Sequence, residues 1–395
     1  MSSLPQNHWR PWLAVVTLGI ASFIVVTTEL APIGMLSAIA KDMAQDPSTT
    51  GLVVTLYAWL ASAAAIISVM TISHLPRRPL MIGLMLLLGL SNALTALTDQ
   101  FSLLLIARLF GAIAHGAFWA VIGTIGAQLV RSNSIGRATA IIFGGVSVAS
   151  VLGVPLMNWV SNLYGWRVSF TLLAILAGMT AAALALTLPQ VQGAARLTGR
   201  QFANVLKNQQ LRVIYLIAIF AIVAHFAAFT FIEVLLNSEL NIPHNWAAAC
   251  LLTFGAAGLV GNFVCGALID KHLKLLLSCA LIVVSIGLAL IGISKVTGLF
   301  MSLLVVAGWG FGIAILFVAL QAWIIRTAGN DALPASAIYA AIFNGAIGTG
   351  AVVGSGILEQ WGISTLYFSA CLMILLSLML VLFNREQSQA QVAID

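Results

Sequence analysis

Repeated apolar runs of membrane-spanning length constrain this 395-residue chain more than any other feature. A helix that crosses a bilayer needs about 20 predominantly apolar residues. Hydrophobic residues make up 61% of the chain and charged residues only 7%, whereas a soluble domain carries about a quarter charged residues. The sequence therefore predicts an all-α polytopic membrane protein, because such a composition is expected where the solvent is hydrocarbon.

Twelve spans result when the apolar runs are divided at charges, prolines and glycine clusters. The predicted spans are residues 12–39, 49–72, 79–97, 101–130, 137–161, 168–188, 211–236, 246–269, 273–294, 297–325, 335–357 and 363–384. The longest connection, residues 189–210, is polar and basic and separates six spans from six. We therefore expect an N-terminal lobe of residues 1–188, a cytoplasmic linker of residues 189–210 and a C-terminal lobe of residues 211–395.

The lysines and arginines predict how the spans are oriented. With the N-terminus inside, all but four of the 17 fall on the inner side. Lys41, Arg167 and Lys295 lie outside, and Arg108 lies within a span. This distribution follows the positive-inside rule, so both termini are expected in the cytoplasm. The basic excess is thus explained by topology, and nucleic acid is not expected as a partner.

The two predicted lobes resemble each other in sequence. Residues 139–156 align with residues 336–357 through a shared Ile-Phe pair. A Gly-Trp pair at 165–166 follows the first segment, and a Trp-Gly pair at 361–362 follows the second. Internal similarity of this kind indicates a duplicated transporter, with the substrate path between the repeats near the middle of the bilayer.

Patterns that would indicate an enzyme or a metalloprotein are missing from the sequence. The four cysteines fall in apolar runs without metal-ligand spacing. Neither a phosphate-binding loop nor a Ser/His/Asp pattern can be read from the chain. We therefore expect no catalytic residues, no metal and no cofactor, and we do not expect ATP to drive the protein.

Several motifs resemble the major facilitator superfamily over essentially the whole chain. VTTELAPIGML at 26–36, AHGAFWA at 114–120, GVPL at 153–156 and AHFAAFTFIE at 224–233 are similar to bacterial sugar efflux transporters of its drug-proton antiporter branch. The resemblance implies two pseudo-symmetric lobes of six helices each. It also implies a monomer in the bacterial inner membrane that exchanges a sugar or related neutral solute for protons. Apolar, aromatic cavities also serve drugs and nucleosides, so an antiporter for those cargoes and an uncoupled sugar facilitator remain alternatives.

The superfamily's cytoplasmic loop motif, a glycine followed by an acidic and a basic residue, is expected once in each half. The second half carries it as Gly266, Asp270 and Lys271. The first half keeps the basic residues Arg77 and Arg78 but has lost the glycine and the aspartate. The resemblance implies a cytoplasmic gate at these five residues, with the first-half contribution weakened.

Ionisable side chains within spans are the strongest candidates for proton coupling, because each costs about 2.5 to 3.5 kcal/mol on insertion scales. Five residues qualify: Glu29, Arg108, His115, His225 and Glu233. Arg108 and His115 are seven residues apart and share one face of the fourth span with Trp119. Alternatively, Arg108 reaches the interface or holds helix ends together, and His115 forms an interhelical hydrogen bond.

The two carboxylates occupy corresponding spans of the two halves. Glu29 precedes Pro32, which loosens the first span, and a desolvated carboxylate that exchanges a proton is what proton coupling requires. Alternatively, Glu29 pairs with Arg108 or caps the broken helix. On the seventh span, His225 and Glu233 are expected to share a face, with Glu233 nearer the outer end. The alternative for Glu233 is a partly exposed carboxylate at a helix terminus.

Aromatic and amide side chains within spans are candidates for substrate binding. Ring faces for stacking on a sugar or an amphiphile are offered by Tyr57, Trp119, Phe143, Phe229 and Phe343. Packing or lipid contact is the alternative for each ring. Asn344 stands where the other repeat has Gly144, which favours an asymmetric substrate contact, with an interhelical hydrogen bond as the alternative.

Overall fold

Helices make up all the regular structure in the part of the chain that the structure describes, and no strand occurs there. This computed structural model describes residues 10–122, 125–131, 134–193, 196–239, 244–293, 296 and 298–384. The long helices of the first half are α1 (Arg10–Leu30), α4 (Leu52–Thr71), α5 (Arg77–Leu97), α6 (Phe101–Ile122), α8 (Ile135–Val148) with α9 (Val154–Tyr164), and α10 (Trp166–Thr187). Those of the second half are α12 (Gln209–Phe229), α14 (His244–Gly292), α15 (Gly298–Ala328) and α16 (Ala332–Phe383).

Two of the second-half helices each contain two membrane-length arms. The α14 helix turns at His272, and α16 turns at Gly362, where the backbone is non-helical. Nine continuous helical stretches in the described residues are long and apolar enough to cross a membrane. Dividing them at these turns and between α15 and α16 gives the twelve spans that the sequence predicts. The prediction of an all-α polytopic membrane protein is therefore confirmed.

Glycines at corresponding places in the two halves allow the chain to reverse. Gly165 separates α9 from α10 with a φ of 90°, and Gly362 separates the arms of α16 with a φ of 79°. Residues with a side chain rarely adopt a positive φ, and glycine does so without steric cost. The Gly-Trp and Trp-Gly pairs of the sequence repeat thus mark equivalent turns.

Several predicted spans are interrupted rather than continuous. Pro32 lies in a 3₁₀ turn, Ala31–Gly34, that separates α1 from the short helix α2 (Leu36–Asp42). A turn at Thr230 and Phe231 ends α12 before α13 (Ile232–Val234). A π-helical stretch, Ala149–Gly153, joins α8 to α9. The α6 helix ends at Ile122, short of the predicted residue 130, and α7 (Gly126–Leu129) is a separate turn.

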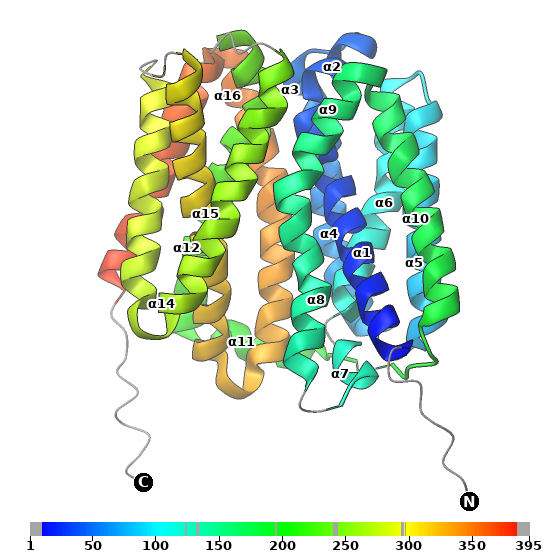
Figure 1. Ribbon diagram of the computed structural model, residues 1–395. Coiled ribbons are helices and arrows are strands. Elements are labelled where there is room, and N and C mark those ends of the chain that lie inside the picture. The colour runs from blue at the N-terminus through cyan, green and yellow to red at the C-terminus, as the bar shows by residue number, and fades with distance from the viewer. Residues whose placement is uncertain are drawn as a thin grey trace, which may run out of the picture.

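The helices form one elongated bundle in which the first-half and second-half helices lie on opposite sides (Figure 1). We call the end at which α1 begins and α16 ends the terminal end. The opposite end, which carries α2 and α3 (Pro47–Thr50), is called the far end. The short helix α11 (Gly199–Lys207) lies at the terminal end and buries Val205 against the second-half core.

Two helix crossings join the halves. The α4 helix packs along α16, and the π-helical stretch with α9 packs along α14. The backbones approach closely at glycines: a Cβ on Gly255 would lie 2.4 Å from the Cα of Val151, and a Cβ on Gly348 would lie 2.5 Å from Cδ1 of Trp59. Only a residue without a side chain fits at these two crossings.

Candidate functional site

Arg108 on α6 reaches the broken end of α1. Its Nη1 donates a hydrogen bond to the carbonyl oxygen of Thr28 at 3.0 Å, and its Nη2 donates to that of Glu29 at 3.4 Å. Pro32 has no N–H, so the helix itself leaves the Thr28 carbonyl without its donor. Arg108 is 1% exposed, and its guanidinium lies 4.2 Å from the Tyr57 ring centroid. Arg108 therefore holds the end of α1, which is one of the alternative roles given for it from the sequence.

The Glu29 carboxylate is directed at His115 rather than bonded to Arg108. Its Oε2 lies 3.7 Å from Nε2 of His115, and both residues are buried, at 7% and 1% exposed. The other oxygen, Oε1, has no hydrogen-bond partner among the described residues. The predicted candidates Glu29, Arg108 and His115 thus meet at one place, built from α1 and α6. They leave one carboxylate oxygen free to bind a proton or a ligand.

Small residues on α6 make room for this cluster. A Cβ on Gly111 would lie 2.6 Å from Oγ of Ser91 and 3.1 Å from Cε2 of Tyr57. The Tyr57 hydroxyl donates to the Gly111 carbonyl oxygen at 3.3 Å. Tyr57 is only 1% exposed, so in this structure it supports Arg108 rather than presenting a ring face to a ligand.

His225 lies inside a cluster of aromatic rings in the second half. The indole Nε1 of Trp309 donates a hydrogen bond to its Nδ1 at 3.1 Å. The Phe229 and Phe254 rings stack on the imidazole, with centroids 5.0 and 6.1 Å away. Phe229 is among the rings that the sequence predicts as substrate candidates, whereas Trp309 and Phe254 are not among them. A tryptophan in the middle of a span rather than at its ends was the available signal.

Glu233 has different surroundings, at the far end and against the other half. Its Oε2 accepts hydrogen bonds from the backbone N–H of Ser37 at 3.0 Å and from the Ser37 hydroxyl at 2.6 Å. Its Oε1 accepts one from the Asn237 amide. The break at Thr230 separates it from the helix that carries His225. Glu233 therefore joins the halves, and the shared face expected for these two residues is interrupted.

Further hydrogen bonds join the halves. The Ser355 hydroxyl donates to the Ser48 carbonyl oxygen at 2.6 Å. The indole Nε1 of Trp59 donates to the Thr349 hydroxyl at 3.2 Å. The Ser48 to Ser355 and Ser37 to Glu233 contacts hold the two halves against each other at the far end, and the Trp59 to Thr349 contact joins them farther along α4 and α16.

The other substrate candidates form two groups. Trp119 and Phe143 lie 5.8 Å apart, and Phe143 is 40% exposed. Phe343 packs against Phe317 with centroids 4.8 Å apart. Asn344 donates to the Ala340 carbonyl oxygen at 3.0 Å, while its buried Oδ1 has no partner among the described residues. Among the predicted substrate candidates, Phe143 is therefore the most exposed ring, and Asn344 has an amide oxygen that can still accept a hydrogen bond.

The predicted gate residues are arranged differently in the two halves. In the second half, Asp270 accepts a hydrogen bond from Arg326 at 2.5 Å, and Lys271 is exposed. In the first half, Arg77 is fully buried and its backbone N–H donates to the Val191 carbonyl oxygen at 2.8 Å. Arg78 donates to the carbonyl oxygen of Ala185.

The linker packs against the first-half loop beside the position at which the motif has lost its aspartate. Nε of Arg196 donates to Nδ1 of His74 at 3.0 Å. Gly193 lies directly on the backbone of His74, since a Cβ there would be 2.2 Å from the His74 carbonyl carbon. A linker arginine thus contacts the first-half loop, whereas the second-half loop is held by the ion pair of Asp270 and Arg326. Gly266, the motif glycine, has open space around it.

Replacing Trp309 by phenylalanine is expected to destabilise the second half. The change leaves Nδ1 of buried His225 without its donor, which costs about 1 to 3 kcal/mol. Thermal unfolding of the detergent-purified protein measures the effect as a lower midpoint. Trp246→Phe is the matched control, because Trp246 is 43% exposed and its replacement is expected to change stability by less than about 0.5 kcal/mol. An equal shift in both variants would contradict this role of Trp309.

Comparison with known proteins agrees with this architecture. The family model described as Major Facilitator Superfamily matches residues 18–334 and also residues 214–394. The crystal structure of the human organic anion transporter MFSD10 (TETRAN) is similar, with a TM-score of 0.69 and 17% identity over 95% of this chain and 100% of that chain. A bacterial homologue of the human lysosomal transporter Spinster, inward-facing and unoccupied, gives a TM-score of 0.70 and 13% identity over 96% of each chain.

The family match spans both halves, and the similar structures cover nearly the whole chain. In the described residues no cluster of His, Cys, Asp and Glu is suited to hold a metal ion. The predicted resemblance to this superfamily and its fold is confirmed. The protein is a secondary transporter, not an enzyme, and the chain belongs to the Major Facilitator Superfamily.

Proposed function

We propose that the protein exports a sugar or a related small neutral solute in exchange for incoming protons. It acts as a monomer in a bacterial inner membrane, with both termini in the cytoplasm. Two lobes, residues 1–188 and 211–395, rock around a central path and are connected by the linker at residues 189–210. The motifs similar to sugar efflux transporters and the distribution of basic residues support this proposal.

The contact between Glu29 and His115 is the observation that carries the proton-coupling proposal. The carboxylate and the imidazole lie 3.7 Å apart in the interior of the bundle. An ionisable group within a span is expected to pair, to face a cavity or to exchange a proton. The unpartnered Oε1 of Glu29 gives an incoming proton a place to bind.

Proton binding at this pair would change the charge beside Arg108. Arg108 is tied to the backbone of Glu29 and Thr28, so its positive charge stays near the carboxylate whether or not the carboxylate is protonated. A proton on Glu29 removes the negative charge that balances this cation. Protonation then shifts the equilibrium between the two lobe arrangements by an amount set by the difference in their proton affinities.

Two neighbouring aromatic rings and an unpartnered amide oxygen suit a neutral cargo. Trp119 and Phe143 offer adjacent ring faces, and Trp119 lies 6.2 Å from His115. Asn344 offers an unpartnered amide oxygen from the second half. Ring faces and an amide bind hydroxyl-rich rings by stacking and hydrogen bonding and do not require a charged ligand.

Transport into inverted membrane vesicles tests the proposal. A panel of sugars, drugs and nucleosides is offered with and without an imposed pH gradient, and vesicles without the protein are the control. Uptake of a sugar that rises with the gradient is expected. Uptake of drugs or nucleosides instead would favour an antiporter for those cargoes. Sugar flux indifferent to the gradient would make the protein an uncoupled facilitator and refute the antiport proposal.

Replacing Glu233 by alanine is expected to loosen the far end. The change removes the acceptor of the Ser37 backbone N–H and hydroxyl, so the two halves separate there more readily. Hydrogen–deuterium exchange should become faster by about 10- to 150-fold in α2, because losing hydrogen bonds to a charged acceptor costs about 1.5 to 3 kcal/mol.

Exchange in α11, at the terminal end, is the internal reference for this experiment and is expected to stay unchanged. Glu359→Gln is the matched carboxylate control, since Glu359 is exposed. Unaltered exchange in α2 of Glu233→Ala would show that the contact does not hold the halves together.

A further inference from the structure

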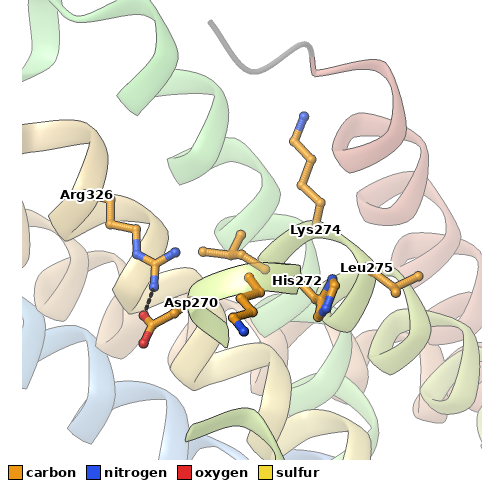
Figure 2. Close-up of a pocket in the computed structure, with 7 residues that line it drawn as sticks. Asp270, His272, Lys274, Leu275 and Arg326 are labelled. Carbon is orange, nitrogen blue, oxygen red and sulfur yellow. Dashed lines mark hydrogen bonds and ion pairs between the residues drawn. The ribbon is translucent and has the colours of Figure 1, made fainter. Parts of the chain in front are cut away.

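A basic cavity lies at the turn between the two arms of α14, apart from the Glu29 and His115 pair. Its volume is about 310 Å³. Residues 270–275 of the turn and Arg326 of α15 line it, and Figure 2 shows the labelled side chains arranged around the turn. Because each arm of α14 is long enough to cross a membrane, the turn between them lies at the membrane surface.

The charges in this cavity do not balance. Lys271, Lys274 and Arg326 supply three cations, and Asp270 is the carboxylate in the lining. Asp270 is already engaged, because Arg326 donates to it at 2.5 Å and also to the Ile269 carbonyl oxygen at 3.3 Å. The two lysines therefore remain as excess positive charge next to a satisfied ion pair.

Lys274 is held in place although it lies at the surface. Its Nζ donates to the Asn384 carbonyl oxygen at 2.5 Å and lies 5.9 Å from the Trp323 ring centroid. An ammonium group has three N–H donors, so donors remain for a further acceptor. Lys271, three residues earlier in the same turn, is exposed. Together they present two ammonium groups from one short, ordered segment.

Exposed leucines flank this basic turn on α14. Leu275, on the arm that follows the turn, is 62% exposed, and Leu268, on the arm that precedes it, is 44% exposed. On a membrane-spanning helix, exposed leucines contact the acyl chains of lipids. The cavity therefore lies where headgroups meet chains, with cations on one side and apolar side chains on the other.

We propose that this cavity binds the phosphate group of an anionic phospholipid. Lys271 and Lys274 would contact the phosphate oxygens, and the acyl chains would lie along Leu275 and Leu268. Basic pockets of this kind at the membrane surface are suited to lipid headgroups, and lysines bind phosphate as point charges. A phospholipid uses both the basic and the apolar part of the site, whereas free phosphate uses only the first.

Native mass spectrometry of the full chain in detergent tests the proposal with added phosphatidylglycerol as the probe. Phosphatidylcholine and inorganic phosphate form the comparison arms. Phosphatidylglycerol is expected to bind in preference to phosphatidylcholine. Lys271→Gln with Lys274→Gln should weaken that binding by about 10- to 30-fold, since each lysine near an anionic surface contributes about fivefold.

The matched control is Arg200→Gln with Lys207→Gln on α11, which removes the same charge from exposed positions at the same end. Thermal unfolding checks that each variant is folded. If the double lysine variant is unfolded, Lys271→Gln alone is used instead, with an expected loss of binding of about fivefold. The proposal is overturned if the Lys271→Gln, Lys274→Gln variant binds phosphatidylglycerol as well as the parent protein does. It is also overturned if this variant and the Arg200→Gln, Lys207→Gln control lose the same amount of binding. If inorganic phosphate binds and the protein shows no preference between the two lipids, the lipid assignment is overturned and free phosphate is the ligand.

Discussion

Replacing Glu29 by glutamine is expected to abolish the dependence of transport on a pH gradient while leaving the fold intact. Glutamine keeps the shape of the side chain and its contact with His115 but cannot exchange a proton. Coupling free energies of about 1 to 3 kcal/mol are typical, which is about 5- to 150-fold. Gradient-driven accumulation in inverted vesicles should fall by a factor in that range. Downhill flux of the same solute should persist.

Two controls separate coupling from damage in this experiment. Glu359→Gln removes an exposed carboxylate of α16 and is expected to leave gradient-driven accumulation unchanged. Thermal unfolding of Glu29→Gln shows whether the site remains assembled, because its backbone carbonyl still accepts from Arg108. Full gradient dependence in a folded Glu29→Gln protein would assign the proton to another group and leave Glu29 structural.

Replacing Arg108 by alanine is expected to destabilise the protein more than any other single change considered. The carbonyl oxygens of Thr28 and Glu29 would lose their side-chain donor in the bundle interior. Each unsatisfied buried acceptor costs about 1 to 3 kcal/mol, and the contacts with the Tyr57 and Phe170 rings are lost as well. The expected result is a lower unfolding midpoint in detergent and a lower yield of folded protein.

The unfolding midpoints of two further variants show whether stability depends on the geometry of the guanidinium group or only on its charge. Arg108→Lys keeps the charge but cannot donate in two fixed directions, so its stability should fall between those of the parent protein and Arg108→Ala. Arg212→Ala is the matched control, since Arg212 is exposed on α12. Equal midpoints for Arg108→Ala and Arg212→Ala would mean that Arg108 does not hold the end of α1.

Hydropathy and charge were sufficient to predict the helices, because the length of a span and the cost of charge in lipid are local properties. Pro32 likewise marked the break after α1, because the missing N–H is a property of that one residue. The predicted face of Arg108, His115 and Trp119 follows from the helical period alone. Each of these features depends on residues close together in the sequence.

Contacts between helices could not be predicted in the same way. Whether Arg108 binds the Glu29 carboxylate or the backbone beside it depends on the rotation of α1 against α6, which the helical period does not fix. Glu233 binds Ser37, which is 196 residues away, and the break at Thr230 turns it from the face of His225. The contact of Arg196 with His74 also required the position of the linker.

The glycine crossings restrict how the two halves can move. At Gly255 and at Gly348, one half touches the other with almost no space between them. Two fixed points define a line, and a rotation about that line keeps both crossings in contact while one end of the bundle opens. A sideways slip would instead drive a backbone or an indole ring into its neighbour. If the halves rock as we propose, this line would serve as the hinge axis, and the stiff helices would transmit a small rotation about it to both ends of the bundle.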